Sequence, residues 1–142
     1  MIVTTYSAKK TVEFAKNFAR RLRNGSVICL EGDLGGGKTT FVKGLAKGLG
    51  IKEDITSPTF VIFKKFKIKD KNFLYHFDLY RLSDPKEVLN LGFEEILRDK
   101  NSIVVIEWAD RIRKILPKES IDVKFEFVGE NVRRIGISNT KH

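Results

Sequence analysis

The chain has 142 residues, 42% hydrophobic and 32% charged, which suits one soluble globular domain spanning 1–142 with a buried core. Its single cysteine, Cys29, excludes a disulfide framework and favours a reducing compartment. No apolar run reaches membrane-spanning length and no cleavable signal is evident at the N-terminus, so we expect a cytoplasmic protein that does not engage a membrane.

The net charge of +9 would suit a partner that carries phosphates. The basic residues are nevertheless scattered along the chain, and no DNA- or RNA-reading motif accompanies them. We therefore interpret them as a solvated lysine-rich surface, with an anionic partner or RNA as the alternative. No binding to DNA is expected.

The first elements expected in chain order are a short strand and a helix. Met1 to Tyr6 can form the strand, and Ser7 can cap a helix from Ala8 to Leu22. Apolar residues recur at helical spacing along that helix, which predicts a stripe facing the core. The stripe consists of Val12, Ala15, Phe18, Ala19 and Leu22.

A short apolar strand, Val27 to Leu30, comes next and leads into a glycine-rich loop. That loop reads Gly-Asp-Leu-Gly-Gly-Gly-Lys-Thr and matches G-x-x-x-x-G-K-[ST], the phosphate-binding P-loop. A helical pattern follows it and ends near Gly50. Strand, loop and helix in this order predict that the chain binds a nucleoside triphosphate.

Each residue type in the loop has a physical task. Glycines let successive backbone N–H groups converge on an anion, and the positive end of the following helix adds to the attraction. Lys38 would reach the β- and γ-phosphates, and the Thr39 hydroxyl would ligate Mg²⁺. The predicted nucleotide-binding residues are Gly32, Asp33, Leu34, Gly35, Gly36, Gly37, Lys38, Thr39 and Thr40.

A hairpin is expected after the P-loop helix. Pro58 favours an extended backbone at the residue before it and so leads into a strand from Phe60 to Lys67. A polar turn separates this strand from a second one, Phe73 to Asp78. The fold class is therefore α/β with a mixed parallel and antiparallel sheet flanked by helices. A plain parallel Rossmann-like sheet is unlikely.

The rest of the chain alternates short helices with strands. Ile103 to Ile106 is the most hydrophobic segment and should be a central strand. The other expected elements are a helix opened by Asp84 and Pro85 toward Leu91, a helical turn from Phe93 to Arg98, a short helix from Ala109 to Ile115, and a hairpin of Ile121–Val128 with Val132–Ile137.

Two carboxylates are candidates for the second acid that a P-loop enzyme needs to hold Mg²⁺ and orient the nucleophile. Glu107 ends the Ile103–Ile106 strand, and strand carboxyl ends are where open α/β sheets gather ligands. Asp78 is a candidate only if its strand runs in the same direction. Either could instead be a surface acid paired with Arg81 or Arg111.

Other residues near these acids carry weaker signals. Ser57 and Thr59 could belong to a loop that covers the γ-phosphate, or could be ordinary turn hydroxyls. Trp108 is expected to be a packing residue, with a nucleotide contact as the alternative. His76 is interpreted as a structural histidine rather than a base.

Several short blocks together resemble the TsaE family, the small bacterial ATPase of tRNA threonylcarbamoyladenosine synthesis. Beside the P-loop they are Ser-Pro-Thr-Phe from Ser57, His-Phe-Asp-Leu-Tyr-Arg-Leu from His76, Leu-Gly-Phe-Glu-Glu from Leu91, and Ile-Glu-Trp ending at Trp108. The resemblance spans about Leu22 to Pro117. Small departures are Gly36, where alanine is common, and Ala109-Asp110, where Pro-Glu is common.

The resemblance implies slow, Mg²⁺-dependent ATP hydrolysis that lets the TsaB–TsaD complex turn over, with tRNA as an indirect partner. It implies that Lys38 and Thr39 bind phosphate and Mg²⁺, and that Asp78 and Glu107 lie at the metal and the γ-phosphate. It also implies that Ser57 to Thr59 form a switch-like loop and that Trp108 lies beside the acid. Arg81, Arg111 or a partner could supply an arginine finger.

Two other classes of function stay open from the residues. A small-molecule kinase would use the same phosphate cradle, although the chain leaves little room for an acceptor pocket and lid. A nucleotide-dependent binding module would change shape without meaningful hydrolysis. A small GTPase is disfavoured because the base-reading Asn-Lys-x-Asp string is absent.

Overall fold

The structure is a computed structural model, and it describes residues 1–32, 37–55, 62–69 and 72–139. The strands are β1 (Ile2–Thr5), β2 (Val27–Gly32), β3 (Phe63–Lys69), β4 (Asn72–Asp78), β5 (Ser102–Glu107), β6 (Ile121–Gly129) and β7 (Val132–Asn139). The helices are α1 (Ala8–Ala19), α2 (Lys38–Gly48), α3 (Lys86–Leu89) and α4 (Phe93–Arg98), with a short 3₁₀ segment, η1 (Ala109–Ile115).

The strands form one seven-stranded sheet in the order β1-β7-β6-β2-β5-β4-β3. The pairs β2–β5, β2–β6 and β4–β5 are parallel, whereas β1–β7, β6–β7 and β3–β4 are antiparallel. The predicted mixed sheet is therefore confirmed, as are both hairpins. All six residues of β5 are buried between β2 and β4, which confirms the predicted interior strand.

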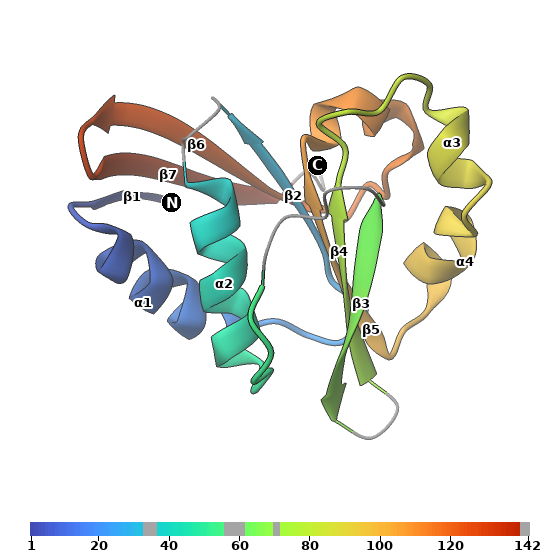
Figure 1. Cartoon of the computed structure of the whole chain (residues 1–142), viewed down its shortest axis with the longest axis horizontal. Coiled ribbons are helices and arrows are strands. Elements are labelled where there is room, and N and C mark those ends of the chain that lie inside the picture. Colours follow the sequence, from blue (N-terminus) through green and yellow to red (C-terminus); the bar gives the residue numbers. More distant parts are fainter. Residues whose placement is uncertain (33–36, 56–61, 70–71, 140–142) are drawn as a thin grey trace.

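Helices cover both faces of the sheet, with α1 and α2 on one side and α3 and α4 on the other (Figure 1). Alternate residues of β2 face opposite cores because side chains along a strand alternate in direction. Ile28 and Leu30 belong to the cluster under α1 and α2. Val27 and Cys29 belong to the cluster under α3, α4 and η1. The strand that leads into the P-loop is thus held from both sides.

The close approach of α1 and α2 depends on two glycines of α2. A Cβ at Gly44 would lie 2.5 Å from the Val12 carbonyl oxygen and 2.6 Å from the Ala15 Cβ. A Cβ at Gly48 would meet Lys16 and Ala19 at similar distances. Gly48 therefore serves the packing of the two helices, in addition to its predicted place at the helix end.

Two predicted helices are shorter in the structure than in the sequence pattern. The first ends at Ala19 rather than at Leu22, because Arg21 and Leu22 donate to carbonyls only three residues back and so tighten the chain into turns. The helix expected from Pro85 to Leu91 is limited to α3. At its start, the Glu87 side chain accepts the Asp84 backbone N–H and the Asp84 side chain accepts the Lys86 backbone N–H.

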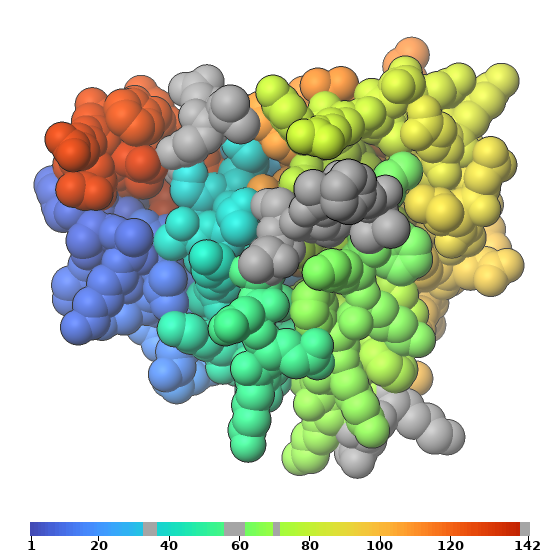
Figure 2. Space-filling model, viewed as in Figure 1, coloured from blue at the N-terminus to red at the C-terminus, as the bar shows by residue number. Residues whose placement is uncertain are grey.

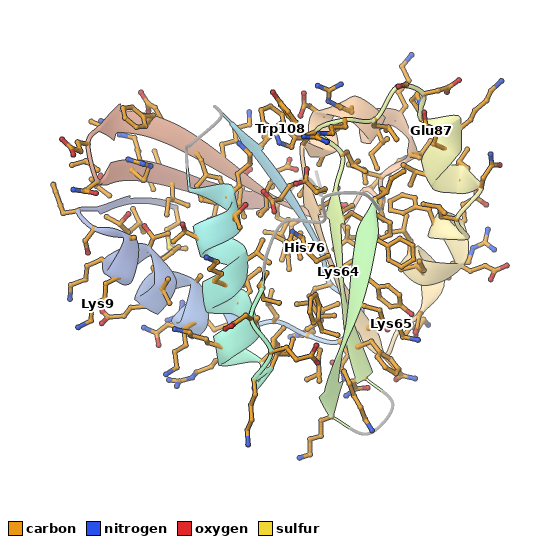
Figure 3. The ribbon with its side chains drawn as sticks, in the orientation of Figure 1. Lys9, Lys64, Lys65, His76, Glu87 and Trp108 are labelled. Atoms are coloured by element: carbon orange, nitrogen blue, oxygen red, sulfur yellow. The ribbon has the colours of Figure 1, made fainter. Side chains whose placement is uncertain are left out.

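The edge strand β3 carries most of the lysine-rich surface on its side of the molecule. Lys64, Lys65, Lys67 and Lys69 are all exposed, which discourages pairing of this edge with another chain. Figure 2 shows β3 and β4 as a green band between α2 and the yellow helices, and Figure 3 labels Lys9, on α1, far from Lys64 and Lys65. Exposed basic side chains thus lie on separate elements.

Across the described ranges, every helix falls short of the length and apolar character needed to cross a membrane.

Candidate active site

Two glycines, one at the end of β2 and one directly before α2, have a backbone that other residues adopt with difficulty. Gly32 has φ +137°, and a Cβ there would lie 2.2 Å from the Phe125 carbonyl oxygen. Gly37 has φ +106° and precedes the first residue of α2. The left-handed region is open to glycine and strained for most other residues. The predicted residues Asp33, Leu34, Gly35 and Gly36 lie outside the described residues.

Lys38 is the first residue of α2 and is only 5% exposed. Its ammonium donates to the Gly32 carbonyl oxygen at 2.9 Å and lies 4.2 Å from the centre of the Trp108 ring. A cation over an indole face is attracted by the negative charge of that face. Lys38 thus joins the first turn of α2 to the end of β2, near the positive end of the helix, and its phosphate contact stays a prediction.

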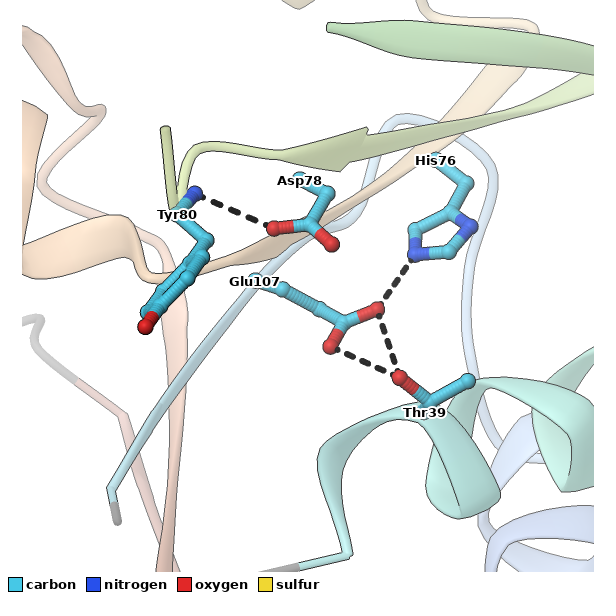
Figure 4. Close-up of polar contacts among 5 residues, drawn as sticks. All are labelled: Thr39, His76, Asp78, Tyr80 and Glu107. Carbon is cyan, nitrogen blue, oxygen red and sulfur yellow. Dashed lines mark hydrogen bonds and ion pairs between the residues drawn. The ribbon is translucent and has the colours of Figure 1, made fainter. Parts of the chain in front are cut away.

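The Glu107 carboxylate lies directly against the start of α2. The Thr39 hydroxyl donates to Glu107 Oε1 at 3.1 Å and approaches Oε2 at 3.4 Å (Figure 4). Glu107 is 2% exposed and also contacts His76, whose Nε2 is 2.6 Å from Oε2. The acid predicted at the end of β5 is therefore in contact with the residue predicted to bind Mg²⁺.

Asp78 lies beside Glu107 because β4 and β5 run parallel and these two residues are register partners. Its Oδ1 accepts the Tyr80 backbone N–H at 3.1 Å. Burial raises the pKa of the Asp78 carboxyl, the Tyr80 N–H opposes this, and the nearby Glu107 carboxylate adds to the rise. The direction of β4, which the sequence left open, is the one that brings both acids to the same end of the sheet.

Trp108 adopts a left-handed backbone with φ 62° at the start of η1. Its backbone N–H donates to the Leu30 carbonyl, which ties it to the P-loop strand, and the centre of its ring lies 5.0 Å from that of Tyr80. The indole therefore faces Lys38 and the cavity. Trp108 is also partly buried against the core cluster under α3, α4 and η1, as expected of a packing residue, and its contact with a nucleotide stays a prediction.

These groups line a cavity of about 290 Å³. One end is formed by the acids and aromatic rings, and the other by α1 and the β6–β7 hairpin. The residues around it are Ala8, Thr11, Gly37, Lys38, Thr39, Thr40, Asp78, Tyr80, Glu107, Trp108, Asn131 and Arg133.

A family model described as "Threonylcarbamoyl adenosine biosynthesis protein TsaE" matches residues 5–135. This chain belongs to the TsaE family. The family of threonylcarbamoyladenosine biosynthesis proteins suggested by the sequence blocks is thereby confirmed.

Full-length similarity supports the same assignment. The TsaE protein of Borreliella burgdorferi is 42% identical over 91% of this chain and 93% of its own length. The TsaE protein of Bacillus subtilis is 40% identical over 92% of this chain and 80% of its own length. The crystal structure of YdiB from Bacillus subtilis superimposes with a TM-score of 0.80 at 34% identity, covering 99% of this chain and 85% of that one.

In this TsaE chain most of the predicted site residues that the structure describes gather around one cavity. Lys38, Thr39, Thr40, Asp78, Glu107 and Trp108 all line it. Ser57 and Thr59 lie outside the described residues. Arg81 is exposed and does not line the described cavity, and Arg111 donates to the Leu82 carbonyl rather than to either acid.

Sequence reasoning missed the wall of the cavity opposite the acids. Arg133 lines it from β7, and its Cγ would lie 3.6 Å from a Cβ at Gly37. Asn131 and Thr11 lie on the same side. Nothing in the chain order signals these residues, because only the packing of α1 and the place of the β6–β7 hairpin in the sheet bring them to the cavity. His76, interpreted from the sequence as structural rather than a base, is buried, contacts Glu107 and does not line the cavity.

The donor set fits Mg²⁺ better than a metal held by protein alone. Among the described residues, no three histidine, cysteine or acidic side chains converge as a metal cage. Thr39 and Glu107 offer neighbouring oxygens, with Asp78 alongside. Because Mg²⁺ usually takes one or two protein oxygens and completes its shell with phosphates and water, this sparse set suits it.

Proposed function

We propose that this chain is an ATP-hydrolysing subunit of tRNA threonylcarbamoyladenosine synthesis that lets the TsaB–TsaD complex turn over repeatedly. The observation that carries the proposal is the contact between Thr39 and Glu107 beside the buried Lys38. A phosphate-binding helix start and a carboxylate at a neighbouring strand end are the parts that P-loop NTPases combine. Membership of the TsaE family supports the pathway.

The residues around the cavity support one orientation of a bound triphosphate over the reverse one. The acids can orient an attacking water only at the γ-phosphate, so this phosphate belongs at the end near Asp78 and Glu107. The nucleoside would then extend toward Arg133 and Thr11 on the opposite wall. The Lys38 ammonium would neutralise charge that develops on the phosphate oxygens.

A bound Mg²⁺ would supply positive charge that offsets the negative charge of the phosphates. Thr39 and one of the two acids would hold it. The remaining acid is then available to accept a hydrogen bond from the attacking water. Slow intrinsic turnover is expected, because the only arginine described on the cavity wall, Arg133, donates to the Gly129 and Val132 carbonyls rather than pointing at the acids.

The test is phosphate release from Mg²⁺–ATP, measured first with this chain alone and then with purified TsaB and TsaD. We expect slow release that rises on mixing. Lys38→Ala should abolish ATP binding. Binding can be measured from the fluorescence of Trp108, the chain's one tryptophan. Lys43→Ala, an exposed change on the same helix, is the matched control.

Glu107→Gln and Asp78→Asn separate binding from hydrolysis. Both should keep nucleotide binding, and release should fall by about 100-fold or more, as is usual when a group that acts in the transition state is removed. Normal turnover in both variants would refute the assignment. Tight ATP binding without release, even with the partners present, would favour the nucleotide-dependent binding module.

A further inference from the structure

His76 is a buried polar side chain that contacts Glu107, one of the two acids of the site. It is 0% exposed and lies on β4 two residues before Asp78, so both side chains leave the strand on the same face. Its Nε2 approaches Glu107 Oε2 at 2.6 Å. Its Nδ1 has no hydrogen-bond partner among the residues that the structure describes. His76 does not line the described cavity, whereas Glu107 does.

The two ring nitrogens therefore have different environments, which selects a tautomer. A neutral imidazole has one N–H donor and one bare acceptor nitrogen. With the proton on Nε2, His76 donates to the carboxylate and leaves only an acceptor unpaired. With the proton on Nδ1, a buried donor would be orphaned and two acceptors would face each other at 2.6 Å. The geometry requires the Nε2–H form when Glu107 is ionised.

This hydrogen bond makes the two Glu107 oxygens unequal. Oε2 lies 2.6 Å from His76 Nε2, and the Thr39 hydroxyl lies nearer to Oε1, at 3.1 Å, than to Oε2, at 3.4 Å (Figure 4). A carboxylate held by one oxygen cannot rotate freely about its terminal bond. Its other oxygen is therefore presented to the start of α2 in one orientation.

We propose that His76 is a positioning residue, which fixes Glu107 by a donated Nε2–H so that the carboxylate faces Thr39 in the orientation that hydrolysis needs. The proposal rests on the proposed ATPase function. Outer hydrogen bonds of this kind orient ligating and catalytic groups, and removing one typically costs about 10- to 100-fold in activity.

The first experiment compares two substitutions of similar length. His76→Gln keeps an N–H donor that can reach Glu107, whereas His76→Met fills the space without one. Phosphate release should fall by about 10- to 100-fold in His76→Met and by only a few-fold in His76→Gln. The Trp108 fluorescence titration should give wild-type ATP affinity for both. Equal losses in the two variants, or no loss in His76→Met, would overturn the proposal.

A double-mutant cycle distinguishes action through Glu107 from a general effect on packing. In the Glu107→Gln background, adding His76→Met should slow phosphate release no further, because the group that it positions is already neutral. The same fold-loss in both backgrounds would assign His76 a structural role and refute the proposal. Denaturant midpoints of the single and double variants verify that every rate comes from folded protein.

A spectroscopic measurement tests the hydrogen bond without reference to activity. In ¹⁵N-histidine-labelled protein, the chain's two histidines are separated by the His142→Ala variant. His76 should show a protonated Nε2 and a bare Nδ1, and Glu107→Gln should shift the Nε2–H resonance. A bare Nε2, with the proton on Nδ1 alone, would overturn the proposal even if a His76 variant failed to fold.

The outcomes also separate this inference from the function that it rests on. If the unmodified chain releases no phosphate, with or without TsaB and TsaD, the ATPase proposal fails. If it hydrolyses ATP and depends on Glu107, but not on the donor at position 76, the positioning role alone fails.

Discussion

Lys38 carries a positive charge in a nearly enclosed position, where an unpartnered charge would be costly. The Gly32 carbonyl and the Trp108 ring both stabilise the ammonium. An ammonium has three N–H donors, so it can hold a backbone carbonyl and a phosphate at once. The contacts that stabilise the buried charge therefore also fix the position of the Lys38 ammonium, between the Gly32 carbonyl and the Trp108 ring.

A second single-residue property follows from the burial of Cys29, which raises the pKa of its thiol to about 12. The thiolate is the reactive form, so the folded protein should resist a thiol reagent such as DTNB at pH 8. Reactivity should appear on unfolding in denaturant, where the pKa returns to its ordinary value. Rapid labelling of the folded chain at pH 8 would contradict this.

The pKa of Cys29 also sets a pH dependence of folding. Between the ordinary cysteine pKa and about 12, the folded state retains a proton that the unfolded state has lost. Stability should therefore fall as pH rises above about 9. Cys29→Ser should remove this slope, which urea midpoints measured between pH 8 and pH 10 would detect. The two proteins are compared by how their urea midpoints change with pH and not by the midpoints themselves, because serine also changes the packing.

Among the elements, the pair α1 and α2 places the phosphate-binding helix. Phe41 of α2 contacts Phe14, Phe18 and Phe125, which joins both helices to the β6–β7 hairpin. Gly44 allows the two helix backbones to approach closely. Contacts within the first two turns of α2 therefore fix the position of its first residues.

Gly44→Ala should destabilise the protein although alanine is the better helix former. The gain in helix propensity is about 1 kcal/mol, but the new methyl would overlap the Val12 carbonyl and the Ala15 Cβ. Overpacking of this kind costs about 1–3 kcal/mol, so we expect a net loss in the free energy of unfolding. Lys43→Ala, on the exposed face, should change it little. A Gly44→Ala variant more stable than wild type would refute the close approach.

For the whole molecule, the sheet links two cores that lie on its opposite faces. β2 contributes Ile28 and Leu30 to one cluster and Val27 and Cys29 to the other. Neither cluster can be exposed without releasing residues of the same strand. The arrangement therefore couples the two faces through the P-loop strand.

This coupling predicts a single cooperative unfolding transition, as expected of one domain. Far-UV circular dichroism reports both helix layers, Trp108 fluorescence reports the site, and Cys29 labelling reports the second core. We expect the three probes to give the same urea midpoint. Separate midpoints would mean that the helices on one face unfold independently, and would contradict the prediction of a single domain.

Much of the local structure was predictable because it depends on neighbouring residues. The P-loop helix, the 93–98 turn, the 109–115 segment and both hairpins follow from apolar period, glycine, proline and capping residues. The end of α1 was predicted three residues too late, since Leu22 continues the apolar pattern while its backbone has already tightened. Periodicity records which residues face the core, and it does not record where helical hydrogen bonding stops.

The sequence by itself determined the chemistry available: a phosphate loop with Lys38 and Thr39, an acid at each of two strand ends, and membership of the family that those blocks resemble. Only the tertiary structure decided that β4 runs parallel to β5, which brings Asp78 beside Glu107 and turns His76 onto that carboxylate. It also decided that Arg133 forms the far wall of the cavity. These contacts join residues far apart in the chain, and strand order and direction, which no local pattern encodes, set them.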